Sequence, residues 1–150
     1  MCTTASRETY LHLLLDCPFT QAVWHVIVCA MSAIGFYYPS SLEECLFGSP
    51  HLTRPWLRVA FAPVWPIVRA CVWFTLWKAR NDNIFRPDSP EATPESVARK
   101  AAFAIKIHLQ HLVLEDPGDP SLVRLMLLLS RNQWARSNLV PEFLAHQVDP

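Results

Sequence analysis

A long apolar segment, residues 56–85, most constrains the fold that this chain can adopt. Pro63 and Pro66 interrupt the segment, and a proline inside a helix removes a hydrogen bond and kinks or breaks the helix. The sequence therefore predicts a short first helix and a longer second one that starts near Pro66. Arg58 and Arg69 argue against a membrane span, because an arginine at mid-span costs about 3 kcal/mol or more.

One face of the longer helix carries apolar and aromatic side chains at helical spacing. Such a stripe is more typical of a buried core than of a ligand-binding platform, so we expect it to face the core. Its members are Ile67, Ala70, Cys71, Phe74, Trp77 and Asn81.

The other segments also show helical periodicity and helix-capping residues, and none shows a strand-like alternation long enough to define a strand. We therefore expect an all-α fold. A Pro-rich linker at 87–94 is predicted to separate residues 1–86 from a C-terminal helical hairpin at 95–150. The expected helices are a short one ending at Leu15, one from Thr20 to Gly35, one after Ser41, one from Thr93 to about Leu114, and one from Asp119 to Ser137.

Charge and composition limit the classes of function. Apolar residues make up 51% of the chain and charged residues 17%, which excludes a disordered tail. The formal net charge of zero argues against strong non-specific binding of nucleic acid by the chain as a whole. Residues 54–106, however, carry nine basic and four acidic side chains, so this middle part is basic. We expect phosphate contacts, if any, in this part.

The cysteines and the N-terminal sequence indicate an intracellular protein, in the cytoplasm or the nucleus. Five cysteines, an odd number, are typical of reduced thiols. No signal-peptide pattern is present at the N-terminus. We expect neither a membrane nor a small-molecule substrate as a partner.

Cys2, His12 and Cys17 form the pattern C-x9-H-x4-C. Sulfur and imidazole ligands brought together by a short turn and a helix are what a tetrahedral Zn²⁺ selects. A structural zinc site has four ligands, and the usual fourth would be a cysteine three residues before Cys2, ahead of Met1. Cys45 is an alternative fourth ligand, although nothing in the sequence fixes its geometry.

The residues around this pattern resemble the reverse-transcriptase zinc-binding domain of non-LTR (LINE-type) retrotransposon polyproteins. That family typically reads C-x-x-C, then E-T-x-x-H-L, C-P-F and a Trp. The matching residues are Cys2, Glu8-Thr9, His12-Leu13, Cys17-Pro18-Phe19 and Trp24. Residues 73–85 look like a second box of the same elements, W-x-x-W-K-x-R-N-x-x-I-F. The two boxes cover roughly the first 85 residues and lack the first cysteine, so we expect an N-terminally truncated fragment with a zinc-knuckle-like motif.

The resemblance implies a non-catalytic accessory region that binds zinc and helps a reverse transcriptase to hold RNA or DNA. Lys78, Arg80 and Arg86 would contact phosphates, and Trp77 would stack on a base. The alternative explanation is that these cations interact with the helix dipole at a C-terminus. A second hypothesis is a truncated helical scaffold without metal, which binds the remaining reverse-transcriptase domains through apolar surface.

The sequence contains no motif that would support an enzyme. It lacks a Gly-rich phosphate loop, a G-x-S-x-G elbow, paired polymerase aspartates and a nuclease-like cluster of carboxylates. Most of the acidic side chains lie at expected helix starts, where capping explains them. We therefore expect no catalytic residue.

Overall fold

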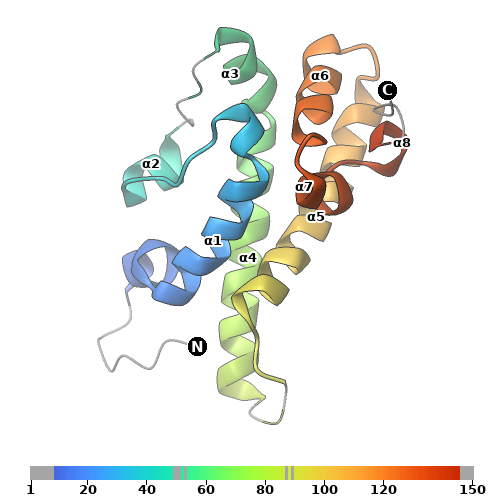
Figure 1. Cartoon of the computed structure of the whole chain (residues 1–150). Coiled ribbons are helices and arrows are strands. Elements are labelled where there is room, and N and C mark those ends of the chain that lie inside the picture. The colour runs from blue at the N-terminus through green and yellow to red at the C-terminus, as the bar shows by residue number, and fades with distance from the viewer. Residues whose placement is uncertain (1–8, 49–51, 53, 87, 89, 146–150) are drawn as a thin grey trace.

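The computed structural model describes residues 9–48, 52, 54–86, 88 and 90–145, and every regular element in these ranges is a helix (Figure 1). The expectation of an all-α fold is thereby confirmed. The elements are η1 (His12–Asp16), α1 (Pro18–Ala30), η2 (Ser32–Ile34), α2 (Leu42–Phe47), α3 (Pro55–Phe61), α4 (Val64–Phe85), α5 (Pro94–Glu115), α6 (Pro120–Leu129), α7 (Gln133–Asn138) and α8 (Glu142–Ala145).

Local signals set the start of α1 and the end of η2, although the single helix predicted from Thr20 to Gly35 is divided, because α1 ends at Ala30. Cys17, in an extended conformation, is the N-cap of α1, so this helix starts at Pro18 and not at the predicted Thr20. Proline suits the first helical position because its missing N–H would have no partner there. Gly35 ends η2 with a φ of 72°, in the left-handed region that glycine adopts without strain.

The predicted break in the apolar segment is confirmed. α3 and α4 are bent by 53° relative to each other, and Pro63 lies in the break. Among the described residues, no single helix is both long and apolar enough to cross a bilayer, although α3 and α4 together reach that length and apolarity despite their bend.

The predicted buried stripe of α4 is wrong in its register. Phe74 is 62% exposed and Trp77 is 52% exposed, and Ala70 is exposed as well. Because the first half of α4 is apolar on all sides, periodicity alone does not select the face that meets the other helices. The residues of α4 that are buried are Val64, Trp65, Val68, Cys71, Val72, Thr75, Leu76 and Ala79.

The caps of the C-terminal helices are the predicted ones. Thr93 and Ser96 form a capping box at the start of α5, and the Asp119 carboxylate accepts hydrogen bonds from the first backbone N–H groups of α6. The single helix predicted after Asp119 is, however, interrupted at Ser130. Asn132 then caps α7, and its Oδ1 accepts a hydrogen bond from the Ala135 N–H at 3.0 Å.

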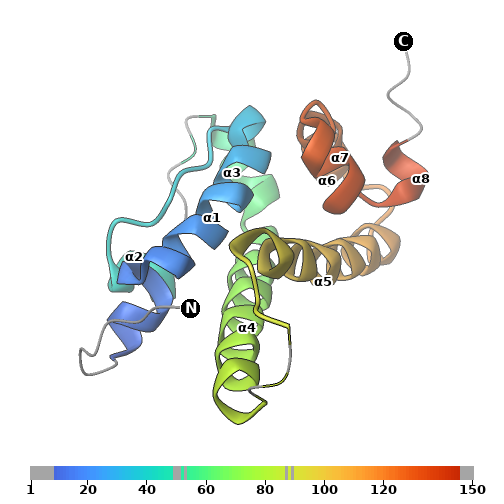
Figure 2. The same ribbon diagram turned by 60° about the horizontal axis from the view of Figure 1, so that its bottom comes forward.

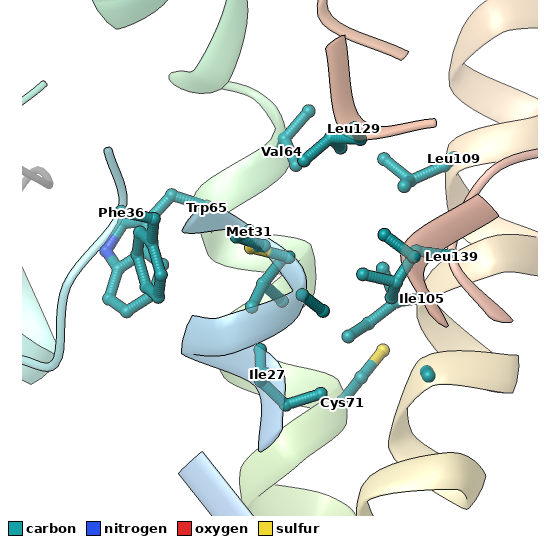
Figure 3. Packing of buried hydrophobic residues seen from close by; sticks show 14 of the residues in the cluster. Ile27, Met31, Phe36, Val64, Trp65, Cys71, Ile105, Leu109, Leu129 and Leu139 are labelled. Carbon is teal, nitrogen blue, oxygen red and sulfur yellow. The ribbon is translucent and has the colours of Figure 1, made fainter. Parts of the chain in front are cut away.

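The helices share one hydrophobic core, to which segments on both sides of the Pro-rich connection contribute. α5 packs against α4 and α1, whereas α6 packs mainly on α3, so the two helices of the predicted C-terminal hairpin lie chiefly against other helices (Figures 1 and 2). Figure 3 shows Ile27 of α1, Cys71 of α4 and Ile105 of α5 among the buried side chains of this core. Trp24 of α1 is fully buried in this core.

Candidate functional site

Two of the three predicted zinc ligands lie on the same turn at the N-terminal end of the described chain. His12 begins η1, and Cys17 is the residue between η1 and α1. The Cys17 N–H donates to the His12 carbonyl at 2.8 Å, and the His12 N–H donates to Thr9 Oγ1 at 3.1 Å. His12 is half-buried and Cys17 is buried. The sulfur and imidazole donors of this turn are the chemical types that zinc prefers.

The third predicted ligand, Cys2, lies outside the described residues. Within the ranges that the structure describes, no three His, Cys, Asp or Glu side chains come close enough together to hold a metal ion. The zinc site at Cys2, His12 and Cys17 therefore stays a prediction.

Hydrogen bonds within the protein also hold this turn in place. Thr20 Oγ1 donates to the Leu13 carbonyl at 2.7 Å, and the Tyr38 hydroxyl donates to the Leu15 carbonyl at 2.8 Å. These two bonds tie η1 to α1 and to the segment before α2. The position of His12 and Cys17 is thus fixed by the polypeptide itself.

Cys45, the alternative fourth ligand, is fully buried against α4. Burial raises the pKa of its thiol to about 11, although the nearby Arg69 guanidinium acts in the opposite direction. A metal binds the thiolate, so the raised pKa and the burial of this thiol make Cys45 a poorer ligand than an exposed cysteine with an ordinary pKa.

Cys29 lies among apolar residues in the sequence, which predicts a buried side chain, but its side chain is exposed on α1. Its Sγ lies 3.5 Å from Nε2 of His25, one helical turn earlier. The spacing of four residues was the signal in the sequence that could have identified this pair.

The predicted phosphate-binding cations lie in the last turns of α4 and just after it. Asp82 pairs with both Lys78 Nζ and Arg86 Nη1, each at 3.3 Å. Lys78 and Arg86 are largely exposed, and Arg80 is half-buried. Exposed pairs of this spacing contribute only about 0.3–0.5 kcal/mol, so a phosphate could replace the carboxylate at little cost.

Exposed rings accompany these cations. The ring centroids of Phe74 and Trp77 are 6.1 Å apart, with 31° between the ring planes, and Phe85 is also exposed. Helical spacing places positions 74, 77, 78, 81 and 85 on the same side of α4. We call Phe74, Trp77, Lys78, Phe85 and Arg86 the α4 surface. Sequence reasoning identified Trp77 and the cations, with Phe85 beside them, but missed that Phe74 joins them.

Comparisons with known proteins add no relative: no family model, no curated protein and no solved structure matches this chain. The likeness to the reverse-transcriptase zinc-binding domain therefore rests on the two sequence boxes described above.

Proposed function

We infer that the α4 surface binds single-stranded nucleic acid, RNA or DNA, as part of a non-catalytic accessory region of a reverse transcriptase. The observation that carries this proposal is the exposure of Phe74 and Trp77 beside Lys78. Exposed aromatic rings next to cations are the usual means of holding unpaired bases together with their phosphates.

The two kinds of side chain have separable roles in this proposal. A base stacked on an exposed ring contributes about 1–3 kcal/mol whatever its sequence. Lys78 and Arg86 would contact phosphates, with Arg80 as a further predicted contact, and a phosphate contact makes the affinity depend on salt. Because duplex bases are already stacked, the rings favour a single strand.

The test is the affinity of the purified chain for a fluorescent homopolymer of unpaired pyrimidines, measured by anisotropy over a series of salt concentrations. Trp77→Ala is expected to weaken binding by about 5- to 150-fold at every salt concentration. Lys78→Ala combined with Arg86→Ala should make the negative slope of log affinity against log salt less steep by about 1.4.

Phe47→Ala and Arg131→Ala provide matched controls, because both side chains are exposed outside the α4 surface. Neither control should change the affinity. Equal losses in the controls and the α4 variants, or no binding by the parent chain, would refute the assignment of the α4 surface.

The zinc part of the proposal assigns Cys2, His12 and Cys17 as ligands. A zinc ion there would cross-link the N-terminal segment to the η1 turn. Elemental analysis of the purified chain tests this assignment: about one zinc that is lost in Cys17→Ser supports it. A folded chain from which Cys17→Ser removes no zinc supports a scaffold that holds no metal at Cys2, His12 and Cys17.

A second candidate function is docking onto other reverse-transcriptase domains. Asp82 already neutralises part of the charge of Lys78 and Arg86, and the exposed side chains Phe74, Trp77, Ile84 and Phe85 are apolar. Binding to a polymerase domain that is insensitive to salt and is lost in Phe74→Ala would favour docking.

A further inference from the structure

His25 and Cys29 project from consecutive turns of α1 on its solvent-exposed side. The side chains face each other, with 3.5 Å between His25 Nε2 and Cys29 Sγ. Neither side chain belongs to the resemblance or to the α4 surface. Cys17, Cys45 and Cys71 are buried, so Cys29 is the exposed one of the four cysteines in the described ranges.

The geometry points to a second zinc site, in which His25 Nε2 and Cys29 Sγ are the two protein ligands. Zinc forms bonds of about 2.3 Å to sulfur and about 2.0–2.1 Å to nitrogen. At a tetrahedral angle of about 109°, these bonds place the two donor atoms about 3.5 Å apart. The observed separation therefore accommodates the ion with no change in the spacing of the donors.

The backbone that carries the pair is held in place before any metal binds. Both residues belong to the regular helix α1, and the Cys29 carbonyl accepts a hydrogen bond from Asn132 Nδ2 at 3.1 Å. Asn132 is itself fixed, because its Oδ1 caps α7. A ligand pair on a rigid helix loses little conformational freedom when it binds, which favours binding.

The other coordination positions of the ion remain open to solvent. Both side chains are exposed, so solvent water would complete the coordination. Two protein ligands with open positions make a site that is weaker and more exchangeable than a closed structural site. Binding converts the Cys29 thiol to a thiolate and releases one proton to solvent.

Cobalt(II) is the probe that tests this site, since it occupies zinc sites and reports a bound thiolate through charge-transfer absorption. The titration uses the Cys17→Ser chain, in which the predicted N-terminal site is disabled. We expect thiolate-to-cobalt absorption that saturates at one ion per chain and disappears when zinc is added. Cys29→Ser should abolish the absorption, and His25→Gln should weaken cobalt binding by about tenfold or more.

His108→Gln is the matched control, because His108 is exposed on α5 and should leave the titration unchanged. Circular dichroism of each variant tests whether the helices remain. The titrations are repeated with Cys29→Ser and His25→Gln in the chain that retains Cys17. Absorption that persists in Cys29→Ser, or its absence from the folded Cys17→Ser chain, would overturn the proposal. Cys29 lies outside the α4 surface, so Cys29→Ser should leave nucleic-acid affinity unchanged, and failure of this site and failure of the α4 surface are distinguishable.

Discussion

The side-chain amide of Asn132 donates to the Cys29 carbonyl at 3.1 Å, which joins the start of α7 to the end of α1 across 103 residues of sequence. The same side chain caps α7 through the Ala135 N–H. One asparagine thus stabilises a helix terminus and a tertiary contact.

Substitutions at Asn132 separate these two contributions. Asn132→Ala should lower the free energy of unfolding by about 1–2 kcal/mol, because both the cap and the tertiary bond are lost. Asn132→Ser retains a capping hydroxyl that is too short to reach Cys29, so we expect a loss of about 0.5–1 kcal/mol. Urea denaturation followed by circular dichroism measures both. No loss in Asn132→Ser would show that the bond to Cys29 contributes nothing, and identical losses in the two variants would show that the cap contributes nothing.

The register of α4 is tested by two neighbouring positions. Leu76 is 2% exposed, so Leu76→Ala should cost about 2–5 kcal/mol through the lost burial and the cavity left behind. Phe74→Ala should cost less than about 0.5 kcal/mol, because Phe74 is mainly exposed. Thermal and urea unfolding of the two variants decide the matter. The opposite order of stability would favour the stripe predicted from the sequence.

Arg69 ties α2 to α4. Its Nη1 donates to the carbonyls of Leu46 and, at 3.3 Å, of Cys45, and its guanidinium lies 5.4 Å from the centre of the Trp73 ring. Lysine offers neither the planar donor group nor the same stacking, so Arg69→Lys should cost about 1 kcal/mol. Faster amide hydrogen exchange in α2 is the expected local effect. Arg58→Lys, at an exposed position, is the control and should leave the amide hydrogen exchange of α2 unchanged.

Stability should fall in alkaline solution because Cys45 is buried. Burial raises the pKa of its thiol from about 9 in the unfolded chain to about 11 in the folded one. The folded state therefore retains the thiol proton more strongly than the unfolded state. The resulting contribution to the free energy of unfolding is complete below pH 9 and is lost as the pH rises to 11. It amounts to on the order of 2 kcal/mol.

The measurement is the free energy of unfolding at pH 7.5 and at pH 10.5, for the parent chain and for Cys45→Ala. The parent should lose more stability over this interval than the variant. Since burial also raises the pKa of Tyr38, some alkaline loss should persist in the variant. Equal losses in the two proteins would rule out Cys45 as a source.

Removal of the Asp82 carboxylate should strengthen nucleic-acid binding. Asp82→Asn releases Lys78 and Arg86 from their ion pairs and leaves both cations free for phosphates. We expect an affinity about three- to fivefold higher at low salt, with the difference fading as salt rises. Glu95→Gln, which breaks the comparable pair with Arg99 on α5, is the control. Weaker binding by Asp82→Asn would contradict direct phosphate contacts.

Local features of this fold could be predicted from the sequence, since their causes are local. Ser41, Thr93 and Asp119 cap the helices that they were expected to cap, and Pro63 lies where the apolar segment bends. A cap needs only a side-chain oxygen within a few residues of free backbone N–H groups. Neighbouring sequence contains all of that information.

The orientation of the helices about their own axes could not be predicted in the same way. Phe74 and Cys29 were expected to be buried, because apolar residues surround both. Which side of α4 or α1 is buried depends on where α5 packs against it, and this packing is set by residues far apart in the sequence. The α4 surface was therefore only half recognised, and the pair of His25 and Cys29 was missed.

The packing of α1 on α5 has a consequence for synthesis of the chain. More than 60 residues separate the end of α1 at Ala30 from the start of α5 at Pro94. At a ribosomal rate of about 5–20 residues per second, roughly 3–12 s pass between the synthesis of α1 and the start of α5, which buries the apolar side of α1. During that interval the nascent chain exposes Val23 and Ile27, and exposed apolar surface of this kind is what chaperones bind during synthesis.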